Sequence, residues 1–112
     1  MSKRSSLLLL EDILDSAHKI LEYTKDLSYQ DFCDDHKTVD AVIRNFEIIG
    51  EAANQLSDEF REKNDNIEWY RIRGFRNRIV HEYFGVDLSI LWIIREKQIP
   101  SLIQEVSRIM AL

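Results

Sequence analysis

The chain has 112 residues, of which 45% are hydrophobic, and a formal net charge of −5. This length supplies one ordinary globular core and little chain for a second, so we predict a single domain over residues 1–112. The acidic balance excludes a protein that coats nucleic acid without specificity, and any contact with nucleic acid therefore has to be local.

The chain has only three glycines and one proline, and this scarcity favours long helices over a fold of many turns. We predict an all-α protein, an antiparallel bundle of four or five helices. The lone Cys33 cannot form an internal disulfide, as is usual in a reducing cytoplasm. The four leucines at 7–10 are too few for an export signal or a membrane span, which need about 7 to 15 and about 20 apolar residues. We therefore predict a soluble, cytoplasmic protein with no membrane contact.

The first predicted helix begins after Ser5 or Ser6, either of which can serve as an N-cap. Residues 25–37 lose the helical period and carry four aspartates and a serine, which predicts a loop with at most a short helical turn. In the first predicted helix, apolar residues recur at steps of three and four and form one stripe. The stripe consists of Leu7, Leu10, Leu14, Ala17 and Leu21.

The second predicted helix is the most regular, with apolar residues at unbroken steps of three and four from Val39 to Phe60, or about six turns. Its opposite flank alternates in charge, which is typical of a solvated face with weak ion pairs. Alternatively, Arg44, Asn45 and Glu47 or Glu51 border a polar cleft, and the sequence leaves both interpretations open. The flank consists of Asp40, Arg44, Glu47, Glu51 and Gln55.

A third helix is predicted over 67–84, after a polar break at 61–66, and it should stop at Gly85. Asp87 can cap the next helix. Pro100 interrupts that helix and predicts either a kink or a fresh helix with proline in its first turn.

The third helix carries an arginine on its apolar face. With Trp69 at zero and about 100° per residue, the apolar residues fall between about 240° and 20°, with Arg76 near 340° and Tyr83 near 320°. A buried guanidinium needs a partner. Arg76 therefore either forms an ion pair with Glu47 or Glu51, or faces a cleft or subunit interface where an anionic ligand is its partner.

His81 falls near 120° by the same count of about 100° per residue, together with Asn77 and away from Arg76. A lone helical histidine is commonly a surface or packing residue. In the last turn, however, the helix dipole favours its protonated form, which suits a general acid or base. With Arg76 beside a phosphodiester, it suggests a ribonuclease that uses the RNA 2′-hydroxyl. The two side chains converge if the last turn loosens, if the arginine reaches round, or if two copies of the helix meet.

The histidines at 18, 36 and 81 lack a metal-binding spacing, and one cysteine makes no zinc cluster, so we predict no metal and no cofactor. The arginines at 71, 73, 76 and 78 spread round the helix as a collar able to gather one or two phosphates.

The pattern Arg76-x-x-x-x-His81-x-Tyr83 resembles the HEPN superfamily, specifically the HepT-like toxins of toxin–antitoxin pairs. The stretch Arg44-Asn45-x-x-Ile-Ile-Gly-Glu-Ala and the segment 87–99 with Trp92 extend the resemblance over nearly the whole chain.

This resemblance implies a metal-independent endoribonuclease that acts as a homodimer on RNA. It implies that Arg76 holds the scissile phosphate and that His81 transfers protons. It also implies a minimal nucleotidyltransferase antitoxin that transfers AMP to Tyr83. Supporting residues of the cleft are then sought among Asn77, Arg73, Arg44, Asn45, Glu47 and Glu51.

A second function fits the same residues. The chain would then be a non-catalytic helical subunit that binds and regulates a nucleotidyltransferase, with Arg76 and Tyr83 at the protein interface or on a nucleotide.

Overall fold

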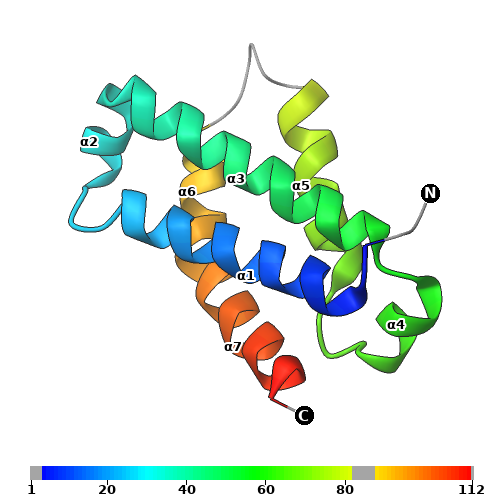
Figure 1. Ribbon diagram of the computed structural model, residues 1–112. Helices are drawn as coiled ribbons and strands as arrows, with labels where there is room; N and C mark the ends of the chain where they lie inside the picture. Colours follow the sequence, from blue (N-terminus) through cyan, green and yellow to red (C-terminus); the bar gives the residue numbers. More distant parts are fainter. Residues whose placement is uncertain (1–3, 82–87, 112) are drawn as a thin grey trace.

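The computed structural model describes the backbone of residues 4–81 and 88–111 and the side chains of 4–75 and 88–111. Within this part of the chain there are seven helices and no strand, which confirms the all-α prediction (Figure 1). The number exceeds the predicted four or five because two helices are short and one predicted helix is divided. The helices are α1 (Ser6–Tyr23), α2 (Tyr29–Asp34), α3 (His36–Gln55), α4 (Asp58–Lys63), α5 (Trp69–His81), α6 (Leu88–Lys97) and α7 (Ile99–Met110).

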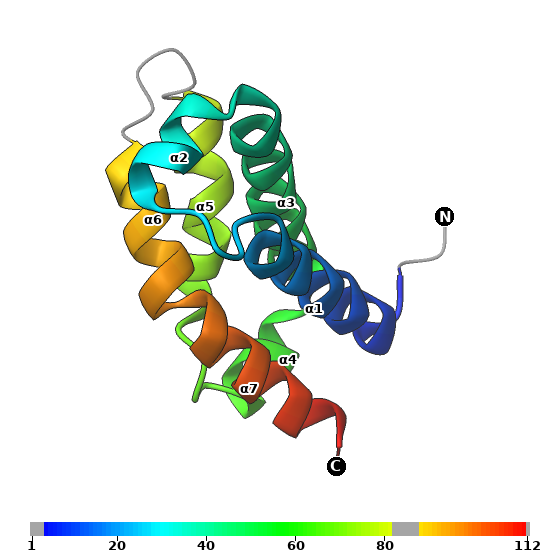
Figure 2. The same cartoon turned by 90° about the vertical axis from the view of Figure 1, so that its left-hand side faces the viewer.

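Helix α3 is the central element of the bundle. It packs against α1 and against α5, while α7 covers α1 and α6 leads into α7 (Figure 2). The short helix α2 contacts both α3 and α6. The core fills the space between these helices and includes Phe46, Ile49 and Ile13, which are fully buried. No helix of the described residues is long and apolar enough to cross a membrane.

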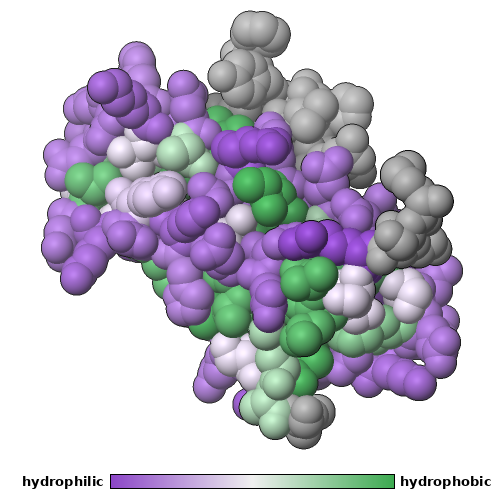
Figure 3. All heavy atoms as spheres, viewed as in Figure 1, coloured by the Kyte–Doolittle hydropathy of each residue, from purple (hydrophilic) through white to green (hydrophobic). Residues whose placement is uncertain are grey.

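Helix α1 begins as predicted, because the Ser5 hydroxyl accepts a hydrogen bond from the Leu8 N–H at 3.2 Å. The buried face of α1 differs from the predicted stripe, because the two share only Leu10 and Ala17. Leu7 is 54% exposed, because the four consecutive leucines offer two neighbouring stripes and packing against α3 and α7 selects one. Figure 3 shows a mostly hydrophilic surface on this side, with apolar residues gathered near α1 and α7. The residues of α1 that are buried are Leu9, Leu10, Ile13, Ser16, Ala17 and Ile20.

The prediction of a loop over 25–37 is only partly correct, because α2 occupies its middle. Ser28 accepts a hydrogen bond from the Asp31 N–H at 3.0 Å and donates its own N–H to the Asp31 carboxylate at 3.3 Å, which forms a capping box. Asp35 caps α3, and the Thr38 hydroxyl, at 2.7 Å, lowers the pKa of the Asp35 carboxyl by hydrogen bonding to its charged form. Asp31 and Asp35 of this segment therefore help to begin α2 and α3.

The prediction of one six-turn helix up to Phe60 is wrong, because α3 ends at Gln55. Ser57 starts α4 by accepting a hydrogen bond from the Phe60 N–H at 3.1 Å. Arg61 covers the end of α3 by donating to the carbonyl oxygens of Ala53 and Leu56, at 3.0 and 2.5 Å. Leu56 and Phe60 still pack on the core, so the apolar spacing continues across the break.

Replacing Ser57 with alanine is expected to lower the free energy of unfolding by about 0.5–2 kcal/mol, because the first turn of α4 loses its side-chain cap. Equilibrium urea unfolding measures this difference. The matched control is Ser107→Ala, at an exposed position inside α7, where alanine should leave stability unchanged or slightly higher. Equal effects of the two substitutions would contradict the capping role.

The third and fourth predicted helices correspond to α5, α6 and α7. Trp69 begins α5, and its indole N–H donates to the Asn64 carbonyl at 2.9 Å. The predicted stop at Gly85 and cap at Asp87 lie outside the described residues. At Pro100 a fresh helix begins, because α7 carries this proline in its first turn.

Candidate active site

Helix α5 holds the backbone of both motif residues, Arg76 and His81, and crosses α3 (Figure 1). Its first half confirms the predicted apolar face, because Trp69, Ile72 and Phe75 are all buried. The Phe75 ring meets the Phe46 ring of α3 edge to face, with centroids 5.3 Å apart. This contact fixes the rotation of α5 on α3 in the turn before the motif.

The side chains of Arg76, Asn77 and His81 lie outside the described side chains, and Tyr83 lies outside the described residues. Their predicted directions from the helix axis therefore stay predictions. The same holds for an ion pair between Arg76 and Glu47 or Glu51.

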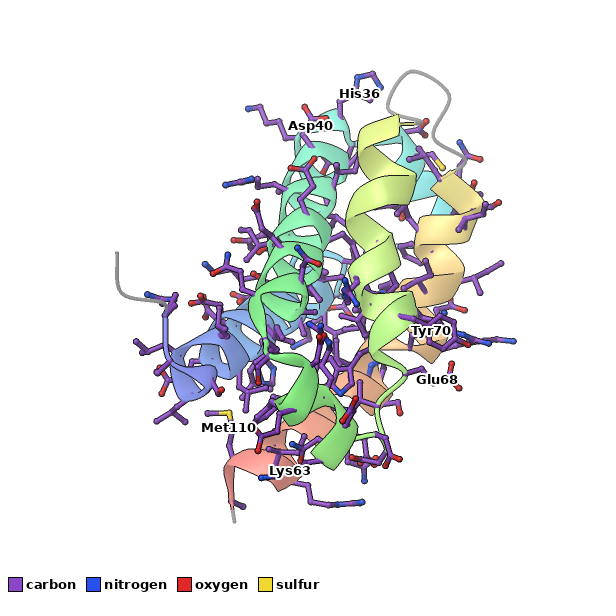
Figure 4. All side chains as sticks on the ribbon, turned by 90° about the vertical axis from the view of Figure 1, so that its right-hand side faces the viewer. His36, Asp40, Lys63, Glu68, Tyr70 and Met110 are labelled. Carbon is purple, nitrogen blue, oxygen red and sulfur yellow. The ribbon has the colours of Figure 1, made fainter. Side chains whose placement is uncertain are left out.

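The charged flank of α3 is largely open to solvent. Arg44 is 66% exposed on its side chain and approaches the Glu47 carboxylate at 3.4 Å, the spacing of a weak surface ion pair. Asp40 and Glu51 are exposed, and Figure 4 shows Asp40 projecting from the first half of α3. Over these residues the flank has the character of a solvated face, with Glu47 partly covered.

Asn45, the other residue predicted to border a polar cleft, is buried, with only 6% of it exposed. Its side-chain N–H donates to the Ala41 carbonyl at 2.8 Å, one turn earlier in the same helix. This bond satisfies the buried amide donor within α3.

A polar contact that the sequence does not reveal joins α5 to α3. The Asn54 side-chain oxygen accepts two hydrogen bonds from Arg73, from Nε at 3.2 Å and from Nη2 at 3.0 Å. Both residues are exposed. The pair is separated by 19 residues in sequence, so only the crossing of the two helices brings it together.

A pocket of about 230 Å³ lies where the start of α5 meets the junction of α6 and α7. Its walls carry both charges, and Arg71 is held by Glu68 at 2.6 Å. The Tyr70 hydroxyl first, and the Glu68 charge second, raise the pKa of the Arg71 guanidinium. Sequence reasoning missed this pocket, because it depends on how distant helices meet. Its lining residues are Asn66, Ile67, Glu68, Arg71, Ile72, Lys97, Gln98, Ser101, Leu102 and Glu105.

Comparisons with known proteins match nearly the whole chain to one family, described as Ribonuclease HepT-like, over residues 13–109. A relative from Methanocaldococcus jannaschii, named "Putative RNase", is 43% identical over 95% of this chain and 97% of that protein. A Caldanaerobacter subterraneus protein, also named "Putative RNase", is 42% identical over 90% of both chains. A Thermococcus cleftensis protein, named "Probable ribonuclease HepT", is 41% identical over 89% of this chain and 91% of its own. No solved structure gives a significant match. The chain therefore belongs to the HepT-like ribonuclease family, which confirms the resemblance carried by its motifs.

Proposed function

We propose that this ribonuclease is the toxin of a toxin–antitoxin pair and cleaves RNA without a metal ion, at a site shared by two copies of the chain. The observation that carries the proposal is that α5 continues unbroken from Trp69 to His81 and so contains both Arg76 and His81 in a chain of the HepT-like family. Tyr83 follows two residues later.

The proposed chemistry needs no group beyond the RNA and these side chains. Arg76 binds the scissile phosphate, for which its planar fork of donors is suited. The RNA 2′-oxygen attacks phosphorus and loses its proton, the bond from phosphorus to the 5′-oxygen breaks, and that oxygen gains a proton. His81 transfers protons in this exchange, and the products are a 2′,3′-cyclic phosphate and a 5′-hydroxyl.

Helix geometry supports a shared site. Five residues along a straight helix separate Arg76 from His81 by about 7.5 Å of rise and about 140° of rotation. Side chains that diverge in this way from one helix can converge when two copies of that helix face each other. The cleft would then hold an arginine from one copy beside a histidine from the other.

The proposed antitoxin is a minimal nucleotidyltransferase that transfers AMP from ATP to the Tyr83 hydroxyl and releases pyrophosphate. The modified tyrosine would carry a bulky anion two residues from His81. Its charge repels the RNA backbone and its volume fills the cleft, so cleavage stops.

The test is cleavage of RNA by the purified chain in the presence of EDTA. We expect 2′,3′-cyclic phosphate ends, and growth arrest when the chain is expressed alone that is relieved by its partner. A requirement for divalent metal would contradict the mechanism. Tight binding to a nucleotidyltransferase with every RNA left intact would instead support the non-catalytic subunit.

A further inference from the structure

Arg73 is an exposed arginine of α5 that is held in place by a neutral side chain. Its Nε and Nη2 donate to the Asn54 side-chain oxygen at 3.2 and 3.0 Å. Two of its five N–H donors are used in this way, and the neutral amide, unlike a carboxylate, does not offset the positive charge. The contact comes from α3, so it sets the direction of the arginine relative to the core of the bundle.

This arrangement distinguishes Arg73 from the other arginines with described side chains. Five of them, Arg4, Arg44, Arg61, Arg71 and Arg108, lie within 4.0 Å of a carboxylate. Arg95 is partly buried, stacks over the Trp92 ring at 4.7 Å and donates to the Thr24 hydroxyl at 2.7 Å. Among the described side chains, Arg73 is therefore the exposed arginine for which the structure gives no carboxylate partner.

The position of Arg73 relates it to the motif. Residue 73 precedes residue 76 on α5 by about 4.5 Å of rise and about 60° of rotation. An anion bound at Arg73 would therefore lie beside one bound at Arg76. Contact with nucleic acid has to be local in an acidic protein. An oriented guanidinium that has no carboxylate partner among the described side chains fits a phosphate at this place.

We propose that Arg73, oriented by Asn54, binds an RNA phosphate next to the scissile one. This inference rests on the proposed ribonuclease site. Arg73 contributes to RNA binding and takes no part in proton transfer. Asn54 is a positioning residue that removes part of the entropy a free arginine would lose on binding.

The experiment measures binding of a fluorescein-labelled single-stranded RNA by anisotropy over a series of salt concentrations. All proteins carry His81→Ala, so that the RNA stays intact. Arg73→Ala should weaken binding and make the slope of log Kobs against log salt shallower by about 0.7, the value for one lost single-strand phosphate contact. Arg73→Lys should keep the slope, and Asn54→Ala should keep the slope while lowering the affinity.

The matched control is Arg108→Ala, because Arg108 is also exposed but pairs with Glu105 on α7. It should leave the slope and the affinity unchanged. An unchanged slope in Arg73→Ala overturns the inference. If that variant instead alters the association of copies in sedimentation equilibrium while its slope is kept, Arg73 belongs to a protein interface and the inference is wrong. The proposed function is tested separately by cleavage with wild-type protein, so the two failures are distinguishable.

Discussion

Replacing His81 with alanine is expected to slow RNA cleavage by about 10²- to 10⁴-fold, the usual contribution of a positioned general acid or base. The proposed reaction moves a proton off the 2′-oxygen and another onto the 5′-oxygen, and without the imidazole both transfers fall to water. Single-turnover rates with a labelled RNA, at saturating protein, measure the chemical step directly. The mass of the protein in solution checks that its assembly is intact.

A matched control comes from His18, an exposed histidine of α1. His18→Ala removes the same ring far along the sequence from the motif and should cleave at the wild-type rate. A fully folded His81→Ala protein with wild-type activity would show that proton transfer does not depend on this residue.

Mixing two inactive variants tests whether the site is shared. In a dimer formed from one Arg76→Ala chain and one His81→Ala chain, an arginine and a histidine from opposite copies restore one intact pair. Exchange of subunits should therefore recover part of the activity. If each site took both residues from one chain, the mixture would remain as inactive as its components.

Replacing Phe46 with alanine is expected to lower the free energy of unfolding by about 3–5 kcal/mol, since the substitution opens a large cavity in the core. Phe46 is fully buried and meets Phe75 of α5 edge to face. Such a loss is a large part of the stability of a typical small protein. Chemical unfolding followed by circular dichroism measures it.

The control for Phe46 is Ile93→Ala, because Ile93 is a large apolar residue of α6 that is 50% exposed. Its truncation should change stability by about 0.5 kcal/mol or less if, as its exposure indicates, it makes few core contacts. A loss below about 1 kcal/mol for Phe46→Ala would contradict the central position of that ring in the bundle.

The core could be predicted from the sequence where the apolar period was unambiguous. Along α3, every apolar position predicted between Val39 and Leu56 is buried. The prediction of helix ends failed, because the apolar period does not show where the helical backbone stops. Leu56 and Phe60 keep their spacing although α3 ends at Gln55, and the Ser57 cap begins a new helix after the break. In α1, four adjacent leucines permit two stripes, and only tertiary packing selects one.

The candidate site, too, could be predicted from the sequence only in part. Arg76, His81 and Tyr83 stand out by spacing and resemblance, and the structure confirms the buried face that precedes them on α5. The bond between Asn54 and Arg73 could not be predicted, since a contact across 19 residues depends on the angle at which two helices cross. The pocket at the start of α5 likewise needs the junction of α6 and α7, which no local pattern encodes.

The attachment of α5 has a consequence for how the ribonuclease can open. In the described residues, α5 packs mainly against α3, while α1 packs against both α3 and α7. Detaching α5 locally therefore costs chiefly its packing on α3, which includes the rings of Phe46 and Phe75, together with the contacts of Trp69 with Phe60 and Asn64. We therefore expect the backbone amides of α5 to exchange with solvent sooner than those of α1 in a hydrogen-exchange measurement. A partner that binds the outer side of α5 would then slow this exchange.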